Sequence, residues 1–375
     1  MSAAGRLDAE ADFEHLLTFL PTGWEEQARA LGALRRCRKV PDARVLLRVL
    51  LIHLAEGCSL RETAVRARQG GWLDISDVAI MDRLRCAGEW FRWLNAGLMA
   101  QWVVRPPACV FGECWQVRVV DGTQVREPGP TGSSWRIHYA VGLPSRRCTE
   151  VHVSDSEGPG CGESFRRFAV RRGDLWLGDR AYGLAPGIAH VVDGGGDVLV
   201  RFGWNNLPLG RAPERPWNLL AHLRGLRGTA LGDWPVFVAH EERRFAGRVC
   251  AVKKSRAAAA AGRRQVRRRA QKHGAQVLAE TLEAAGYVFV FTTVAPELLG
   301  AAQVLEFYRG RWQVEGVFKR LKSILGLGHL RKSDPEAARA WLHGKLFVAF
   351  LLEALRRRGA SFFPWGYPLP PAPGA

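Results

Sequence analysis

The stretch from residue 116 to residue 202 places the strongest constraint on the fold, because predicted strands and helices follow one another in it. Short helices fit 164–170 and 188–192. Apolar and β-branched runs predict strands at Gln116–Val120, Trp135–Val141, Thr149–Val153, Leu175–Leu177 and Val198–Phe202. Three strands, then helix, strand, helix and strand, is the order of an α/β domain.

The segment Tyr308–Lys322, YRGRWQVEGVFKRLK, carries an unusual mixture of charges. Read as one α-helix, it places five polar side chains within roughly 80° of one another: Tyr308, Arg311, Glu315, Lys319 and Lys322. The adjoining side is apolar: Val314, Val317, Phe318, Leu321 and Leu325. One carboxylate among cations suits a site that binds a metal ion and phosphate together. On periodicity alone, a solvated face with i,i+4 ion pairs is the better interpretation.

Two aspartates upstream change that interpretation. Asp121 begins DGT after the apolar run QVRVV, and Asp179 begins DRAYG after LWLG. Together with Tyr308-x2-Arg311-x3-Glu315-x6-Lys322, this order resembles the DDE transposases of the insertion-sequence-4 (IS-four) family, whose signature is Y-(2)-R-(3)-E-(6)-K. The resemblance runs from about residue 114 to about residue 355 and is weaker in the N-terminal part.

The resemblance implies a ribonuclease H-like core. In such a core Asp121 leaves the first strand and Asp179 leaves the fourth, and these strands are neighbours, so the carboxylates would meet. Asp121, Asp179 and Glu315 are then the expected catalytic residues and metal ligands. Carboxylates are the ligands that Mg²⁺ prefers, with Mn²⁺ as a substitute, and we expect two ions about 4 Å apart.

The remaining signature residues are expected to contact DNA. Arg311 and Lys322 would hold phosphates, and Tyr308 would donate to a phosphate or orient Glu315. Lys319 faces the same way but lies outside the signature, so its role stays open.

The predicted organisation has five parts. Residues 1–105 form an all-helical, DNA-binding domain, and 106–202 the first part of the core. Residues 203–296 form a β-rich basic insertion, with strands at Pro235–Ala239, Arg248–Val252 and Tyr287–Thr292. Residues 297–358 complete the core with helices, the last of which begins at Pro335, and 359–375 are a Pro-rich tail.

The N-terminal part contains a candidate helix-turn-helix. Ser59-x2-Glu62 predicts a capping box that opens a helix at Leu60–Arg68, and Ser76 is expected to cap a long amphipathic helix reaching Leu98. Four arginines nearby could meet a DNA end: Arg66, Arg68, Arg83 and Arg85. An ordinary helical domain remains the alternative.

Arg243–Lys272 contains twelve Lys and Arg residues and no acid. Its second half, GRRQVRRRAQKHG, has cations all round a predicted helix. We expect phosphate contacts there from Arg263, Arg264, Arg267 and Arg268. A solvated helix face is the alternative.

The charge balance agrees with a polyanionic partner. Lys and Arg number 54 against 36 Asp and Glu, a formal net charge of +18, which favours nucleic acid first and a membrane surface second. The apolar runs are too short to cross a bilayer, so no membrane partner is expected. The scattered cysteines lack metal-site spacing, so a zinc site is rejected and a cytoplasmic, nucleoid-associated protein is expected.

Other polar residues are interpreted as structural. His138 and His152 lie in strands, and Asp155, Glu163 and Asp174 are expected in loops or caps. The glycine-containing stretch 154–164 lacks a GK[ST] ending, so nucleotide binding is rejected.

The resulting hypothesis is a transposase that cuts its element at terminal inverted repeats and joins the ends to target double-stranded DNA. The resemblance implies a cut-and-paste route and catalysis in a synaptic homodimer. Two alternatives stay open: a catalytically silent DNA-binding protein derived from a transposase, and a general ribonuclease H-like nuclease.

Overall fold

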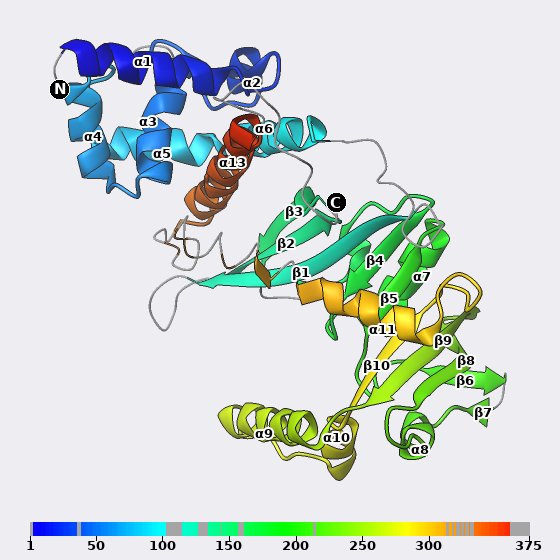
Figure 1. Ribbon diagram of the computed structural model, residues 1–375. Helices are drawn as coiled ribbons and strands as arrows, with labels where there is room; N and C mark the ends of the chain where they lie inside the picture. Colours follow the sequence, from blue (N-terminus) through cyan, green and yellow to red (C-terminus); the bar gives the residue numbers. More distant parts are fainter. Residues whose placement is uncertain are drawn as a thin grey trace.

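The computed structural model describes residues 3–35, 39–102, 115–126, 134–143, 145–156, 161–212, 215–312, 315, 316, 319, 323, 326, 330 and 334–360. In this part of the chain, helices lie at both ends and a large mixed sheet lies between them (Figure 1). The protein is therefore mixed α/β, as predicted. None of the helices described is long and apolar enough to cross a membrane.

The N-terminal part is helical, as predicted. Its helices are α1 (Ala3–Leu17), α2 (Trp24–Ala30), α3 (Ala43–Ala55), α4 (Leu60–Gln69), α5 (Asp77–Cys86) and α6 (Gly88–Ala100). The capping box is confirmed: the Ser59 hydroxyl accepts from the Glu62 amide, and the Glu62 carboxylate accepts from the Ser59 amide. These bonds satisfy two amides that a helix start leaves unpaired.

The long helix expected after Ser76 is instead two helices. Ser76 caps only α5, which ends at Cys86, and α6 begins at Gly88 after the joint residue Ala87. Both α5 and α6 pack against the last helix, α13 (Pro335–Ala360).

Ten strands of the described residues form one sheet in the order β3-β2-β1-β4-β5-β10-β9-β8-β6-β7. Strand β1 pairs with β4 and β4 with β5 in parallel, and the other pairs are antiparallel. The strands are β1 (Gln116–Arg126), β2 (Ser134–Gly142), β3 (Arg147–Asp155), β4 (Asp174–Gly178), β5 (Asp197–Arg201), β6 (Leu209–Ala212), β7 (Arg215–Pro216), β8 (Leu231–His240), β9 (Arg243–Lys253) and β10 (Tyr287–Thr292). Every strand predicted from the sequence is present.

The strands between residues 203 and 296 extend the same sheet. β10 pairs with β5 over Leu199–Arg201, so β10 joins the later strands to the earlier ones. The helices of this part and those after β4 are α7 (Ala185–Asp193), α8 (Leu219–Arg224), α9 (Arg256–Lys272), α10 (Ala279–Ala284) and α11 (Ala301–Arg309). Figure 1 shows α9 and α10 together beside the ends of β9 and β10.

Two buried apolar layers cover opposite faces of the central strands. Val119 and Leu177 belong to the layer shared with α3, α5, α6, α11 and α13, whereas Val120 and Trp176 belong to the layer under α7. Successive residues of a strand point to opposite faces, which explains this division. Helix α13 packs on the N-terminal helices and also touches β3, so it joins them to the sheet (Figure 1).

The prediction that Asp174 lies in a loop or cap is wrong. Asp174 opens β4 with only 1% of its side chain exposed and forms an ion pair with the buried Arg118 at 2.9 Å. His138 is also buried, bonded to Ser154 at 3.1 Å, and burial lowers its pKa to about 3. Both groups serve the sheet.

Candidate active site

The register of the central strands brings the two predicted aspartates to the same level. In the parallel pair of β1 and β4, Val119 lies opposite Leu177. Asp121 and Asp179 each follow two residues later, so they lie side by side although distant in the sequence. The Asp179 carboxylate is held by the Ala181 amide at 2.8 Å, and that of Asp121 by the Gly122 amide at 2.8 Å.

The prediction that Asp121 leaves the first strand is wrong. Asp121 lies within β1, opposite Tyr139 of β2, and the strand continues to Arg126. The DGT sequence resembles a turn, but pairing with β2 supplies hydrogen-bond partners that keep it extended.

A third carboxylate joins the pair, and it is not the predicted one. Ligand oxygens of Asp121, Glu163 and Asp179 all lie within 4.8 Å of one another. The sequence alone predicts a loop or cap residue at Glu163. Glu163 does precede the short 3₁₀ helix η1 (Phe165–Arg167), but its side chain reaches the aspartates. No local sequence pattern marks it, because only the packing of η1 determines where it points.

Burial raises the pKa values of Asp121 and Glu163, and repulsion among the three acids adds to the effect. Burial, followed by the charges of Asp179 and Glu315, raises the pKa of Asp121 to about 6, against the Gly122 amide and Arg311. Burial and the charges of Asp179 and Asp121 raise the pKa of Glu163 to about 7, against Arg136. A bound divalent cation would relieve this repulsion, so the residues present fit such an ion.

Glu315 lies just outside this acidic group. Its carboxylate accepts a hydrogen bond from the Arg311 guanidinium at 2.8 Å, and the same guanidinium lies 3.9 Å from the Asp121 carboxylate. Glu315 is 59% exposed at its side chain, whereas Arg311 is 17% exposed. Arg311 therefore connects the predicted third acid to the first.

The signature segment is not one continuous helix. Helix α11 ends at Arg309, and a 3₁₀ turn, η2 (Gly310–Trp312), follows it. The Gly310 amide bonds to the carbonyls of Phe307 and Tyr308, and glycine weakens an α-helix at this point. Tyr308, Arg311 and Glu315 still lie together across this turn: the Arg311 guanidinium donates to the Glu315 carboxylate at 2.8 Å and lies close to the Tyr308 ring. Glu315 is itself helical.

The other signature residues have different surroundings. The Arg311 guanidinium lies 5.9 Å from the centre of the Tyr308 ring, and burial raises the pKa of that phenol. Lys319 is exposed. Lys322 lies outside the described residues, as does the predicted apolar stripe of Val314, Val317, Phe318, Leu321 and Leu325.

Arg180, which follows Asp179 in the chain, is exposed to the positive charges of other arginines. Partial burial and the positive charges of Arg201 and Arg269 lower the pKa of the neighbouring Arg180. Arg269 belongs to α9, so the basic helix extends its field to this end of β4. Such a cationic border beside carboxylates is typical of sites that hold phosphate.

Helix α9 presents its predicted arginines to solvent. Arg263, Arg264, Arg267 and Arg268 are all exposed, although the Arg263 Nε atom donates to the Leu282 carbonyl at 3.2 Å.

Part of the basic run has a structural role instead. Arg243 pairs with Asp193, and Lys254 donates to the Ala285 carbonyl. Arg248 is buried, where it pairs with Asp233 at 2.6 Å and donates to the Val294 carbonyl. These cations are therefore occupied within the protein.

The comparisons with known proteins agree with this geometry. The family model described as "Transposase DDE domain" matches residues 114–351. The InsL protein of insertion sequence element IS186A from Escherichia coli (strain K12) is 34% identical over 352 residues, 92% of this chain and 93% of the relative. The "Transposase for insertion sequence element IS421" of Escherichia coli is 34% identical over 353 residues, with the same coverage. The chain belongs to the DDE transposase family.

This membership confirms the resemblance drawn from the three motifs, including its insertion-sequence-4 character. A "Transposase for insertion sequence element IS231F" of Bacillus thuringiensis subsp. israelensis is 43% identical over 63 residues, 16% of this chain and 13% of the relative. The region matched by the family model contains the acidic group, Arg311 and Glu315. The long matches cover 92% of the chain, so they extend beyond the residues of the family model.

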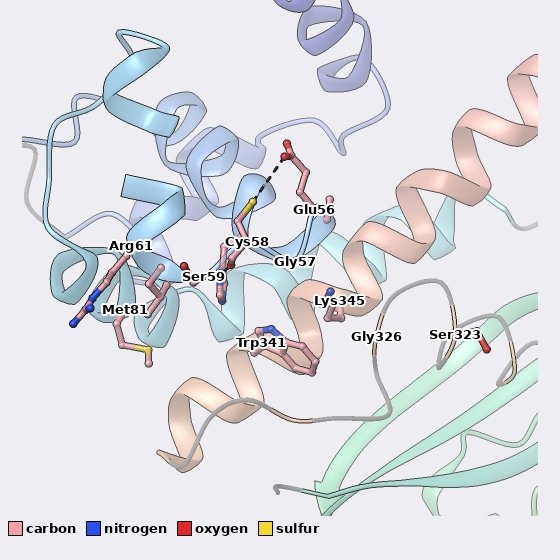
Figure 2. A pocket seen from close by; sticks show the side chains of 13 residues that line it. Glu56, Gly57, Cys58, Ser59, Arg61, Met81, Ser323, Gly326, Trp341 and Lys345 are labelled. Carbon is pink, nitrogen blue, oxygen red and sulfur yellow. Dashed lines mark hydrogen bonds between the residues drawn. The ribbon is translucent and has the colours of Figure 1, made fainter. Parts of the chain in front are cut away.

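This DDE transposase also has a cavity remote from the acidic group. It measures about 590 Å³ and lies between the turn from α3 to α4 and helix α13 (Figure 2). Its lining includes Glu56, Cys58, Arg61, Trp341 and Lys345 and none of the three clustered acids. The cavity is therefore not the place where the carboxylates would act.

The candidate helix-turn-helix of this transposase carries arginines that are paired within the protein. Arg66 pairs with Glu56, Arg68 with Asp74 at 3.0 Å, and Arg85 with Asp334 at 2.9 Å. A role of these arginines in reading DNA remains a prediction.

Proposed function

We propose that this chain cleaves DNA at the inverted-repeat ends of an insertion sequence and joins those ends to target DNA by a cut-and-paste route. The observation that carries the proposal is the convergence of Asp121 and Asp179 beside Arg311 and Glu315. Phosphodiester transfer requires charge stabilisation and positioning more than covalent help from the protein. An acidic group with a cationic border supplies both.

Asp121, Asp179 and Glu315 would hold Mg²⁺, or Mn²⁺ in its place. When bound, a pair of such ions activates a water molecule or 3′-hydroxyl and stabilises the leaving oxygen. Arg311 would release Glu315 toward the ions and hold a DNA phosphate. The strand order β3-β2-β1-β4-β5 supports a ribonuclease H-like core, with residues 203–296 as an insertion that lengthens its sheet.

The DNA partner would lie along the cationic border. Tyr308, Arg311, Lys319 and Lys322 would contact the cleaved end, and the exposed arginines of α9 would contact phosphates further along the duplex. Two ends must be held together for cut-and-paste transposition, so we propose that a homodimer forms the synaptic complex. The site of action would be the cytoplasmic nucleoid.

The test is cleavage of a duplex that carries the element's own inverted repeat, with Mg²⁺ or Mn²⁺. Asp121→Asn, Asp179→Asn and Glu315→Gln should each lower the rate about a hundredfold or more, because each removes charge stabilisation of the transition state. DNA binding should persist. Glu306→Gln is the matched control, since Glu306 is an exposed acid on α11 that pairs only with Arg309 among the described residues.

Cleavage retained in any of the three variants would contradict the assignment of that residue. Binding of the wild-type protein to the repeat without any cleavage under Mn²⁺ would instead indicate a catalytically silent DNA-binding protein. Cleavage of any duplex at equal rate would indicate a general nuclease.

A further inference from the structure

Glu163 lies just before η1, which is packed on the face of the sheet under α7. The next residue, Ser164, caps η1 by accepting from the Arg166 amide at 3.2 Å. Phe165 is fully buried, and its ring lies 5.1 Å from that of Tyr182 and 6.3 Å from that of Trp176. The backbone at Glu163 is therefore fixed beside the end of β4, and its carboxylate has little freedom to leave the aspartates.

Gly122 makes room for this carboxylate. A Cβ atom at position 122 would lie 2.6 Å from the Glu163 Oε1 atom, closer than such atoms approach one another. The Glu163 side chain is 17% exposed, and the Arg136 guanidinium donates to it at 3.3 Å. Arg136 beside Glu163 and Arg311 beside Asp121 are two cations against three carboxylates, so the group keeps excess negative charge.

Tyr182 provides a second and independent observation. Its side chain is 1% exposed, and its hydroxyl has no hydrogen-bond partner among the described residues. Burial, followed by the charges of Glu163, Asp121 and Asp179, raises the pKa of this phenol. A buried hydroxyl without a partner costs stability, and a ligand water held by a cation among the carboxylates would satisfy it.

We infer that Glu163 is a fourth carboxylate of the metal site, so that Asp121, Glu163 and Asp179 bind a divalent cation before Glu315 takes part. The inference deepens the proposed function and rests on it for the role of the metal. It explains why three carboxylates converge while Glu315 is held at a distance by Arg311. It also assigns different tasks to the two glutamates: Glu163 retains the ion, and Glu315 completes the site.

The experiment measures Mn²⁺ binding to the full chain without DNA, by electron paramagnetic resonance of the free ion. Glu163→Gln should weaken Mn²⁺ binding about tenfold or more, as expected for removal of a ligand. Glu315→Gln should change it less than about threefold. Arg136→Gln should not weaken it, because this change removes the ion pair but keeps the carboxylate.

The inference would be overturned if the Glu163→Gln variant bound Mn²⁺ with the affinity of the wild-type protein, or if the wild-type protein did not bind Mn²⁺. Equal losses in Arg136→Gln and Glu163→Gln would also overturn it, since the ion pair would then be the important feature. If Glu163→Gln fails to fold by circular dichroism, Glu163→Asp replaces it. Aspartate keeps the charge but retracts the oxygens, so weaker Mn²⁺ binding supports the inference and unchanged binding refutes it.

The two proposals fail differently. A wild-type protein that binds Mn²⁺ through Glu163 but never cleaves repeat ends would refute the proposed function and leave the inference standing. Cleavage by the wild-type protein, with unchanged Mn²⁺ binding in Glu163→Gln, would do the reverse.

Discussion

At the scale of residues, ionisation of Asp121 and Glu163 is unfavourable in the folded, metal-free protein. Asp121 and Glu163 have pKa values raised to about 6 and about 7 from ordinary values of 3.8 and 4.5. Both carboxylates are less than one-fifth exposed, so solvent screens their repulsion only partly. The native state therefore binds protons more tightly than the unfolded chain does.

This difference predicts that the metal-free protein loses stability as pH rises. A raised carboxyl pKa stabilises the fold below pH 4, and that contribution disappears as pH rises through about 6 to 7. In EDTA, the unfolding free energy should fall by about 1–3 kcal/mol between pH 5 and pH 8, at about 1.4 kcal/mol per pKa unit. Urea unfolding of the wild type and of Asp121→Asn measures it.

The variant should show a flatter dependence on pH, because one titrating group is gone. Added Mn²⁺ should stabilise the wild type at pH 8 and much less at pH 5, where protons compete for the same oxygens. Parallel pH curves for the two proteins would contradict the prediction.

At the scale of elements, α9 and α11 differ in how they are packed: α11 is packed on the sheet, whereas α9 is mostly exposed. α11 packs on the sheet and delivers Tyr308, while the turn after it delivers Arg311. α9 buries only Ala259 and exposes its arginines. A helix so poorly packed and so densely charged is stabilised little by its own contacts, which favours an external polyanion.

The α9 arginines predict a specific change in the salt dependence of DNA binding. Replacing Arg264, Arg267 and Arg268 by Gln should make the dependence of the DNA-binding constant on salt less steep. The slope of log K against log salt is negative, and its magnitude should fall by about 3, because each phosphate that an arginine neutralises contributes about 0.9 to it. The stability of the fold should not change. The measurement is fluorescence anisotropy with labelled duplex over a salt series.

The control neutralises three exposed arginines elsewhere, Arg211, Arg227 and Arg244. An equal decrease of slope in the control would mean that α9 contributes only general charge. An unchanged slope in the α9 variant would exclude the proposed binding of phosphates by these arginines.

At the scale of the whole molecule, α13 joins the two ends of the chain. Asn95 of α6 donates to the His343 carbonyl of α13 at 3.0 Å in a buried position. Close approach depends on Gly344, where a Cβ atom would lie 2.6 Å from Leu54 and 3.3 Å from Phe91. The N-terminal helices therefore pack closely against α13.

Gly344→Ala should therefore destabilise the protein by about 1–3 kcal/mol through overpacking, despite the higher helix propensity of alanine. Gly316→Ala is the matched control, because position 316 is helical and no atom of the described residues lies within 4 Å of an added Cβ. That change should be neutral or stabilising. Urea unfolding measures both, and equal effects would contradict the packing described.

The sequence by itself determined the elements and the family. Strand patterns and the Ser59 capping box are local, and local preferences act between near neighbours along the chain. They predicted the strands of the sheet. The order of the motifs that contain Asp121, Asp179 and Glu315 gave the resemblance to the family, and that resemblance implied the meeting of the two aspartates.

Only the tertiary structure decided which third acid joins them. Glu163 reaches the aspartates because Phe165 is buried under α7, and Glu315 stays apart because Arg311 lies between its carboxylate and that of Asp121. The continuous sheet and the seat of α13 on the N-terminal helices have the same origin. Contacts between distant residues set these features, and no local pattern along the chain encodes them.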